Sequence, residues 1–325
     1  MNNMPVLDAI DPEIIDRLTE RHTEIAQGSP APSGITAALA MGSIPIALAA
    51  LSHNVYAQGG LPAAIKNVLD FALALEIFEN EFYKAVLGTS ASTAQNAAFA
   101  PVRALAAAVP GAVPTLQQIQ KHETAHVATL TATGATNVFN LDATSFDFTG
   151  ARGAGGGPFS KATTDLAFLL EVAQGAEDTG VRAYKGQAGN LISNSAILEA
   201  ALRIHSVEAR HASRIRRMRR AAAGAPAVVR YSGTVRGGER AAAGGTDLGT
   251  VNPTAVGAAF DKIYGAGANS TTAPSESNTT QAGVNVANLA GAQFGIEAAQ
   301  EAFDEPLDRA DVIAIVQPFF IPTVS

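Results

Sequence analysis

Apolar residues recur at helical spacing in four long segments of the chain between residues 62 and 220. Positions i, i+3, i+4 and i+7 lie on one face of an α-helix, so each segment has one continuous apolar stripe. A shorter helical pattern lies between two prolines, Pro101 and Pro110. Four amphipathic helices of this length predict an all-α protein built on a four-helix bundle. The expected long helices span residues 62–87, 114–131, 159–188 and 193–220.

The bundle is expected to occupy residues 61–222, between an N-terminal region at 1–60 and a loop-rich C-terminal extension at 223–325. Proline, glycine, serine and threonine are frequent in the C-terminal extension, and short helical patterns interrupt it. These short helices are expected around residues 253–264, 282–303 and 307–316.

The N-terminal region combines a helical pattern at residues 5–27 with an uncharged apolar run at residues 34–51. The run follows Arg17 and Arg21, as an export signal would, but its lead is long and also acidic. It is short for a membrane-spanning helix and contains Pro45. The run is therefore interpreted either as a packed helix or as a signal or anchor. The sequence likewise leaves open whether the protein is cytoplasmic or is exported or periplasmic, and whether it associates with a membrane.

Each long helix carries a glutamate on its apolar stripe, where a core helix should be apolar. The second and fourth helices contain Glu-x-x-His, and the first and third contain a glutamate seven residues before a Tyr-Lys pair. The order Glu…Tyr and then Glu-x-x-His thus occurs twice, which indicates an internal duplication of a helical hairpin. The residues concerned are Glu76, Tyr83, Glu123, His126, Glu177, Tyr184, Glu208 and His211.

These spacings have a physical reason. Residues three apart are neighbours on one helix face, so the glutamate and histidine of a Glu-x-x-His pair can reach one cation. A tyrosine seven residues from a glutamate lies about two turns away on the same face, where its hydroxyl could support a ligating carboxylate. Four buried carboxylates need compensation, and two divalent cations would balance their charge with both imidazoles neutral.

Composition narrows the chemistry further. The chain contains no cysteine, which excludes disulfides, thiolate nucleophiles and cysteine-bound metals, so any metal must be held by histidine and carboxylate. The net charge of −7 argues against a nucleic-acid-binding surface. The arginine-rich run at residues 210–220 is interpreted as cations at a helix C-terminus, and no nucleic-acid partner is expected.

Four stretches, FALALEIFENEFYKAVL, HETAHV, EDTGVRAYKG and IHSVEARHASRIR, resemble the ferritin-like domain family. More closely, the chain resembles the bacterial branch related to plant desiccation-related proteins. The tail stretches SESNTTQAGVNV and EAFDEPLDRADVIAIVQPFF fit the same branch, so the resemblance extends over about residues 60–325. It implies a ferritin-like four-helix bundle with a carboxylate-bridged centre of two iron or manganese ions.

The resemblance also implies a role for each residue of this centre. Glu76 and Glu177 would be terminal ligands, Glu123 and Glu208 would bridge the two metals, and His126 and His211 would each give one metal a nitrogen ligand. Tyr83 and Tyr184 are expected to support the ligands. Glu79, one turn from Glu76, is an alternative ligand, and Glu81 and Glu171 also compete. His122 and His205 are expected to flank the centre.

Two hypotheses of function follow. In the first, the dimetal centre oxidises ferrous iron or consumes peroxide in stress protection, with metal ions and dioxygen or peroxide as partners. In the second, the protein is a non-catalytic stress- or desiccation-related scaffold or interaction protein. Whether the protein is an enzyme stays open between the two, and a homo-oligomer is compatible with both.

Overall fold

The computed structural model describes residues 60–222, 262–263, 278–289 and 302–324. The helix predicted at residues 5–27 and the apolar run at 34–51 lie outside these described residues. Most of the helices predicted around 253–264 and 282–303 also lie outside them.

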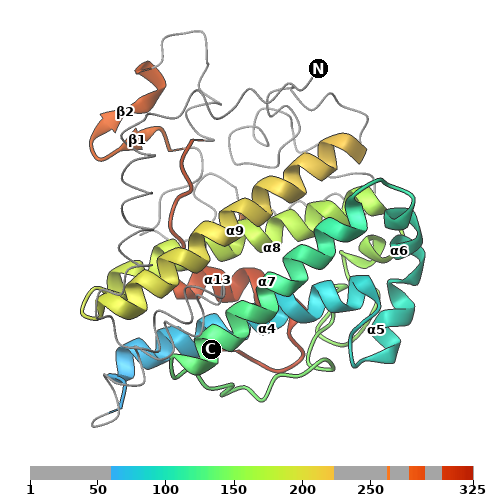
Figure 1. Cartoon of the computed structure of the whole chain (residues 1–325), viewed down its shortest axis with the longest axis horizontal. Helices are drawn as coiled ribbons and strands as arrows, with labels where there is room; N and C mark the ends of the chain where they lie inside the picture. Colours follow the sequence, from blue (N-terminus) through green and yellow to red (C-terminus); the bar gives the residue numbers. More distant parts are fainter. Residues whose placement is uncertain (1–59, 223–261, 264–277, 290–301, 325) are drawn as a thin grey trace, which may run out of the picture.

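Four long helices form the body of the described structure: α4 (Ala63–Leu87), α7 (Ala112–Ala132), α8 (Leu166–Gln187) and α9 (Ser195–Ala222). Helix α4 packs along α7, and α8 packs along α9, so the bundle consists of two helical hairpins (Figure 1). The predicted all-α bundle is therefore confirmed. No helix among the described residues combines the length and the apolar character needed to cross a membrane.

Helix ends follow local side-chain chemistry. Helix α4 begins directly after Pro62 and ends at Gly88, whose φ of 79° gives the left-handed conformation that glycine adopts most readily. Helix α8 begins at Leu166 and not at the predicted residue 159. Asp165 caps it by accepting a hydrogen bond of 3.0 Å from the Phe168 amide, which fixes the first turn at this point.

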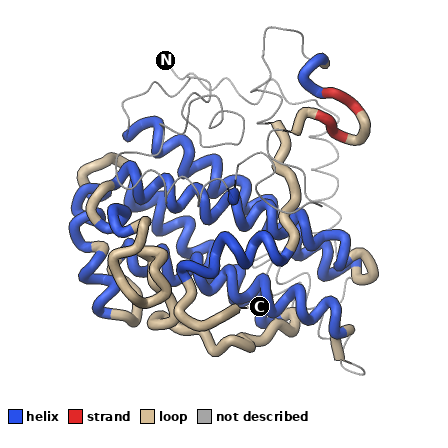
Figure 2. Tube along the Cα trace, turned by 180° about the vertical axis from the view of Figure 1, so that it is seen from behind, coloured by secondary structure: helices blue, strands red, loops and turns tan. Residues whose placement is uncertain are grey.

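Shorter helices connect the long ones. Between α4 and α7 the structure has two helices, α5 (Thr93–Ala98) and α6 (Ala100–Ala107), where the sequence predicted one. The 3₁₀ helix η2 (Ser160–Thr163) precedes α8, and η3 (Ala188–Leu191) joins α8 to α9. The connection between α7 and α8 is otherwise a long loop. Figure 2, which views the molecule from behind, shows loops lying across the helices.

The described part of the C-terminal extension contains a small hairpin and one α-helix. Strands β1 (Thr280–Gln281) and β2 (Val284–Asn285) pair antiparallel, followed by η5 (Val286–Asn288), and Gly283 turns between them with a φ of 81°. The helix predicted from residue 282 is therefore wrong at its start. Helix α13 (Arg309–Val316), capped by Asp308, lies within the predicted 307–316, and η6 (Gln317–Phe319) follows it.

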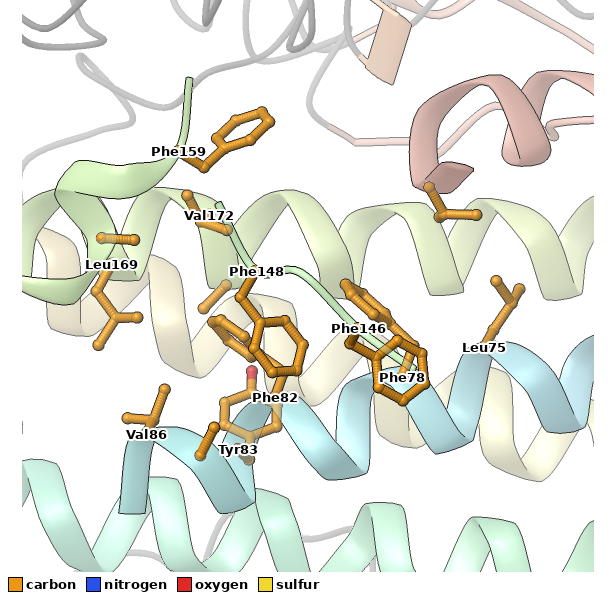
Figure 3. Packing of buried hydrophobic residues seen from close by; sticks show 14 of the residues in the cluster. Leu75, Phe78, Phe82, Tyr83, Val86, Phe146, Phe148, Phe159, Leu169 and Val172 are labelled. Atoms are coloured by element: carbon orange, nitrogen blue, oxygen red, sulfur yellow. The ribbon is translucent and has the colours of Figure 1, made fainter. Parts of the chain in front are cut away.

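The loop after α7 supplies aromatic residues to the core. Phe146 and Phe148 pack against α4, with ring centroids 5.8 Å and 5.9 Å from that of Phe78. Phe320, beyond α13, stacks on Phe78 at 5.5 Å. Figure 3 shows this cluster between α4 and α8. Loop and tail thus complete a core that the four helices alone would leave uncovered.

The C-terminal segment docks directly on α8. The buried Arg182 side chain donates a hydrogen bond of 2.7 Å to the Glu305 carbonyl, and the Leu307 amide donates one of 3.1 Å to the Arg182 carbonyl. The contact requires a glycine, because a Cβ atom at Gly186 would lie 1.8 Å from the Leu307 carbonyl oxygen. The backbone of the tail therefore lies against α8.

Candidate metal centre

The six predicted ligands come from all four long helices and meet in the middle of the bundle. Their side chains are almost completely withdrawn from solvent, and the most exposed of them, His126, is 7% accessible. Two apolar clusters lie on either side, one containing Tyr83 and the other containing Tyr184. The carboxylates therefore occupy a polar layer inside an otherwise apolar interior.

The ligand atoms fall into two groups that share two residues. In each group, one ligand atom from every residue lies within 4.8 Å of the others. The first group is Glu76, Glu123, His126 and Glu208, and the second is Glu123, Glu177, Glu208 and His211. Glu123 and Glu208 belong to both groups, so their carboxylates connect the two sets of ligand atoms.

Each imidazole faces three carboxylates through its Nδ1 atom. His126 Nδ1 lies 3.1 Å from Glu76 Oε2, 3.1 Å from Glu123 Oε2 and 2.9 Å from Glu208 Oε1. In the other group, His211 Nδ1 lies 2.9 Å from Glu123 Oε1, 3.2 Å from Glu177 Oε2 and 3.6 Å from Glu208 Oε2. The two halves of the centre therefore have the same set of donors in nearly the same arrangement.

Both tyrosines hydrogen-bond a glutamate, but each reaches across to the other hairpin. Tyr184 of α8 donates a hydrogen bond of 2.5 Å to Glu76 of α4. Tyr83 of α4 donates to Glu177 of α8. The seven-residue spacing had suggested a tyrosine beneath the glutamate of its own helix, whereas the bonds join α4 to α8 in both directions.

His122 belongs to neither group of ligand atoms and lies beside the centre, where it contacts His211. Its Nδ1 lies 2.8 Å from Nε2 of His211, and the two rings stack at 5.1 Å. Gln118 contacts the other ring nitrogen of His122 at 2.6 Å. His122 precedes His126 by four residues, and this spacing on one helix face was the available signal. His205 belongs to neither group of ligand atoms.

The glutamates that the sequence offered as alternative ligands do not belong to the two groups of ligand atoms. Glu81 forms an ion pair with Lys84 at 2.7 Å, and Glu171 forms one with Arg219 at 3.2 Å, both away from the centre. Glu79 is buried beside the centre but belongs to neither group. Arg216 of the arginine-rich run pairs with Asp178 at 3.0 Å inside the bundle.

The carboxyl groups of the centre have strongly shifted pKa values. Burial raises the pKa of Glu76 to about 8 and raises those of Glu79 and Glu177 well above the ordinary range. Burial also opposes a charge on Glu208, but the His126 and His211 imidazoles beside it outweigh burial and lower the pKa of that carboxyl. Without metal, the centre therefore retains protons at neutral pH.

The pKa values of the two imidazoles are raised, whereas burial alone would lower the pKa of a histidine. Burial alone lowers their pKa values, but the surrounding carboxylates outweigh burial, raising the pKa of His211 to about 12 and that of His126 further still. Each imidazole thus holds a proton between carboxylates. A metal that binds here must displace these protons, so its affinity increases with pH.

Buried polar atoms without a hydrogen bond are frequent at the centre. They indicate whether its residues fit a metal. Among the described residues, several buried ligand atoms have no hydrogen bond of acceptable geometry: Glu123 Oε1, Glu177 Oε2, both Glu208 carboxylate oxygens and His211 Nδ1. Such atoms cost free energy when buried, unless a cation accepts their lone pairs. Oxygen and imidazole donors suit iron and manganese, so the donor set fits.

Comparison with known families agrees with this geometry. Residues 65–221 match the family model described as "Ferritin-like domain". This part of the chain is thus similar to a ferritin-like domain, and its buried glutamate and histidine groups could hold a metal ion. Neither the curated proteins nor the solved structures yield a match to the chain.

Proposed function

We propose that this domain binds two iron or manganese ions in a carboxylate-bridged centre and uses them in redox chemistry. The observation that carries the proposal is the pair of ligand groups that share Glu123 and Glu208. One metal would be held by Glu76 and His126, and the other by Glu177 and His211. Both would be bridged by the two shared carboxylates, so four negative charges would balance two divalent cations.

Bound iron or manganese supplies one-electron redox steps, which suit ferrous oxidation by dioxygen or peroxide and peroxide disproportionation. The chain contributes the surroundings. The apolar clusters on both sides exclude water, which strengthens electrostatic interactions inside the centre. Tyr83 and Tyr184 fix the orientation of Glu177 and Glu76, and His122 fixes the ring of His211. A role in stress protection is part of this proposal and rests on the sequence resemblance.

The experiment is an anaerobic titration of metal-free protein with ferrous iron, followed by addition of dioxygen or hydrogen peroxide. Two ferrous ions per chain should bind, and the absorbance of ferric iron should then appear with both ions oxidised. Binding of fewer than two ions, or binding without oxidation by either oxidant, would overturn the proposal.

The second hypothesis, a non-catalytic scaffold, makes a prediction about stability. A scaffold would be as stable without metal as with it, since nothing in its function requires the cations. The unsatisfied ligand atoms at Glu123 and Glu208 favour the metal-binding proposal over this alternative. Elemental analysis of protein purified without chelator distinguishes the two.

A further inference from the structure

An apolar cavity lies between α4 and α8 and is covered by the C-terminal segment. It leaves about 40 Å³ for the centres of water-sized molecules. In Figure 3 the Leu75 side chain points from α4 toward α8, and Phe78 lies on the same helix. The side chains that shape most of its wall are Leu75, Phe78, Val172, Ile315, Val316 and Phe319.

Among the residues that the structure describes, the lining contains two polar side chains, Glu79 and Thr179. The Thr179 hydroxyl donates a hydrogen bond of 2.6 Å to the Gly175 carbonyl within α8, so its proton is already used. Of the lining side chains in the described part of the chain, the Glu79 carboxyl and the acceptor oxygen of Thr179 are thus left to face an occupant. A molecule with several hydrogen-bonding groups of its own would find almost no partners here.

One end of the cavity reaches the metal centre at Gly180. This glycine lines the cavity, and a Cβ atom at its position would lie 3.3 Å from Glu79 Oε1 and 3.7 Å from Glu208 Oε2. Glu208 is one of the two carboxylates shared by both ligand groups. The absence of a side chain at residue 180 thus leaves room between the cavity and the Glu79 and Glu208 carboxylates.

Size and polarity together restrict the occupant. One water molecule needs about 10–15 Å³ of such space, so the cavity has room for roughly three water-sized molecules. Cavities lined by apolar side chains stay dry and bind apolar atoms or molecules. The wall therefore favours an uncharged apolar molecule of a few heavy atoms. Hydrogen peroxide, with two hydroxyl groups, does not belong to this class, whereas dioxygen does.

We propose that this cavity is a binding site for a small apolar molecule and that it delivers dioxygen, not hydrogen peroxide, to the Glu79 side of the centre. The use of the bound molecule rests on the proposed function, whereas the binding site itself rests on the cavity alone. The two parts are therefore tested separately.

The first test uses xenon as an apolar probe and needs no metal. Crystals of the metal-free wild-type protein are pressurised with xenon, and anomalous scattering locates the atoms. A xenon atom in contact with Phe78, Val172 and Ile315 is expected. In Ala176→Val, two added methyl groups fill part of the cavity and should remove this atom. The absence of xenon from the wild-type cavity would overturn the binding site.

The second test compares oxidants in the protein loaded with ferrous iron. Ala176→Val should slow oxidation by dioxygen about tenfold, which corresponds to the cost of a few misplaced methyl carbons in an apolar pocket. Oxidation by hydrogen peroxide should keep its wild-type rate. Equal slowing with both oxidants, or no slowing with dioxygen, would overturn the delivery of dioxygen.

A matched control fills a second apolar cavity. Ala200 lines that cavity, which lies among α4, α8 and α9 and leaves about 30 Å³ on the same measure. Ala200→Val introduces the same side chain and should leave oxidation by dioxygen unchanged. If the wild-type protein oxidises iron with neither oxidant, the proposed function fails, while the xenon experiment still decides whether the cavity binds an apolar molecule.

Discussion

At the scale of single residues, four glutamates in the interior of one bundle need a compensating partner. Glu123, Glu177 and Glu208 have no measurable solvent exposure, and Glu76 is 1% exposed. Without metal, burial raises the pKa of Glu76, and the neighbouring Glu208 and Glu123 carboxylates raise it further, although His126 lowers it. Two divalent cations would replace the protons that the centre retains and also satisfy the ligand atoms that lack hydrogen bonds.

Removing a shared carboxylate should reduce the number of bound metals more than removing a terminal one. Glu123→Ala takes a ligand from both groups and should abolish binding of both metals, whereas Glu76→Ala should leave one metal per chain. Elemental analysis of each purified variant measures the stoichiometry. Glu81→Ala, at an ion pair outside the centre, is the control and should keep two metals. Two metals per chain in the Glu123→Ala variant would refute the shared role.

The tyrosine hydroxyls should tune metal affinity without changing the number of metals. Tyr83→Phe frees Glu177, and Tyr184→Phe frees Glu76, so each variant weakens one of the two metals. Loss of such a supporting hydrogen bond typically costs about 10- to 100-fold in metal affinity. Competition with a chromogenic chelator measures it. Unchanged affinity for both metals in both variants would exclude this supporting role.

The shifted pKa values predict how pH affects the metal-free protein. The folded chain keeps a proton on Glu76 up to about pH 8, whereas the unfolded chain releases it near the ordinary value of 4.5. Stability therefore falls as pH rises through this window, because the folded state binds more protons. The raised pKa of His211 acts in the same direction above pH 6.5. The lowered pKa of Glu208 acts in the opposite direction, but only below 4.5.

Calorimetry should accordingly show a lower melting temperature for metal-free protein at about pH 8 than at about pH 6. Metal binding should remove this difference, because the cations replace the protons. A metal-free melting temperature that stays constant or rises between these pH values would contradict the proton-binding account of the centre.

At the scale of secondary-structure elements, the apolar periodicity predicted the four long helices and placed one glutamate of each in the interior. The ends were less predictable, since the start of α8 is fixed by the cap at Asp165 and not by its apolar pattern. The crossed bonds of Tyr83 and Tyr184 could not be predicted either. Spacing along one helix places a residue on a face, but only the packing of α4 against α8 decides which side chain it meets.

Because the tail docks closely on α8, substitutions at two glycines in consecutive elements should differ in their effect on stability. Gly186→Ala places a methyl group against the Leu307 carbonyl and should destabilise the protein by about 1–3 kcal/mol, as overpacking does. Gly189→Ala is the matched control, because no atom lies within 4 Å of the added methyl group. Urea unfolding compares the two variants. Equal stability of both would show that the tail does not depend on this close approach.

At the scale of the whole molecule, the repeated order Glu…Tyr and Glu-x-x-His indicated the centre from the sequence alone. Its surroundings depend on contacts between distant segments, which no local pattern encodes. The cavity needs Phe78 of α4, Val172 of α8 and Ile315 of α13 together. Similarly, the role of His122 depends on the position of His211, 89 residues later in the chain.

The proposed function requires two metal ions between Glu123 and Glu208. The decisive experiment is a crystal structure of protein purified without chelator, with anomalous diffraction recorded at the iron and manganese absorption edges. We expect two anomalous peaks in the bundle, each bound by both shared carboxylates and by one of the two histidines, His126 or His211. A single peak, no peak, or metal bound elsewhere would contradict the proposed function.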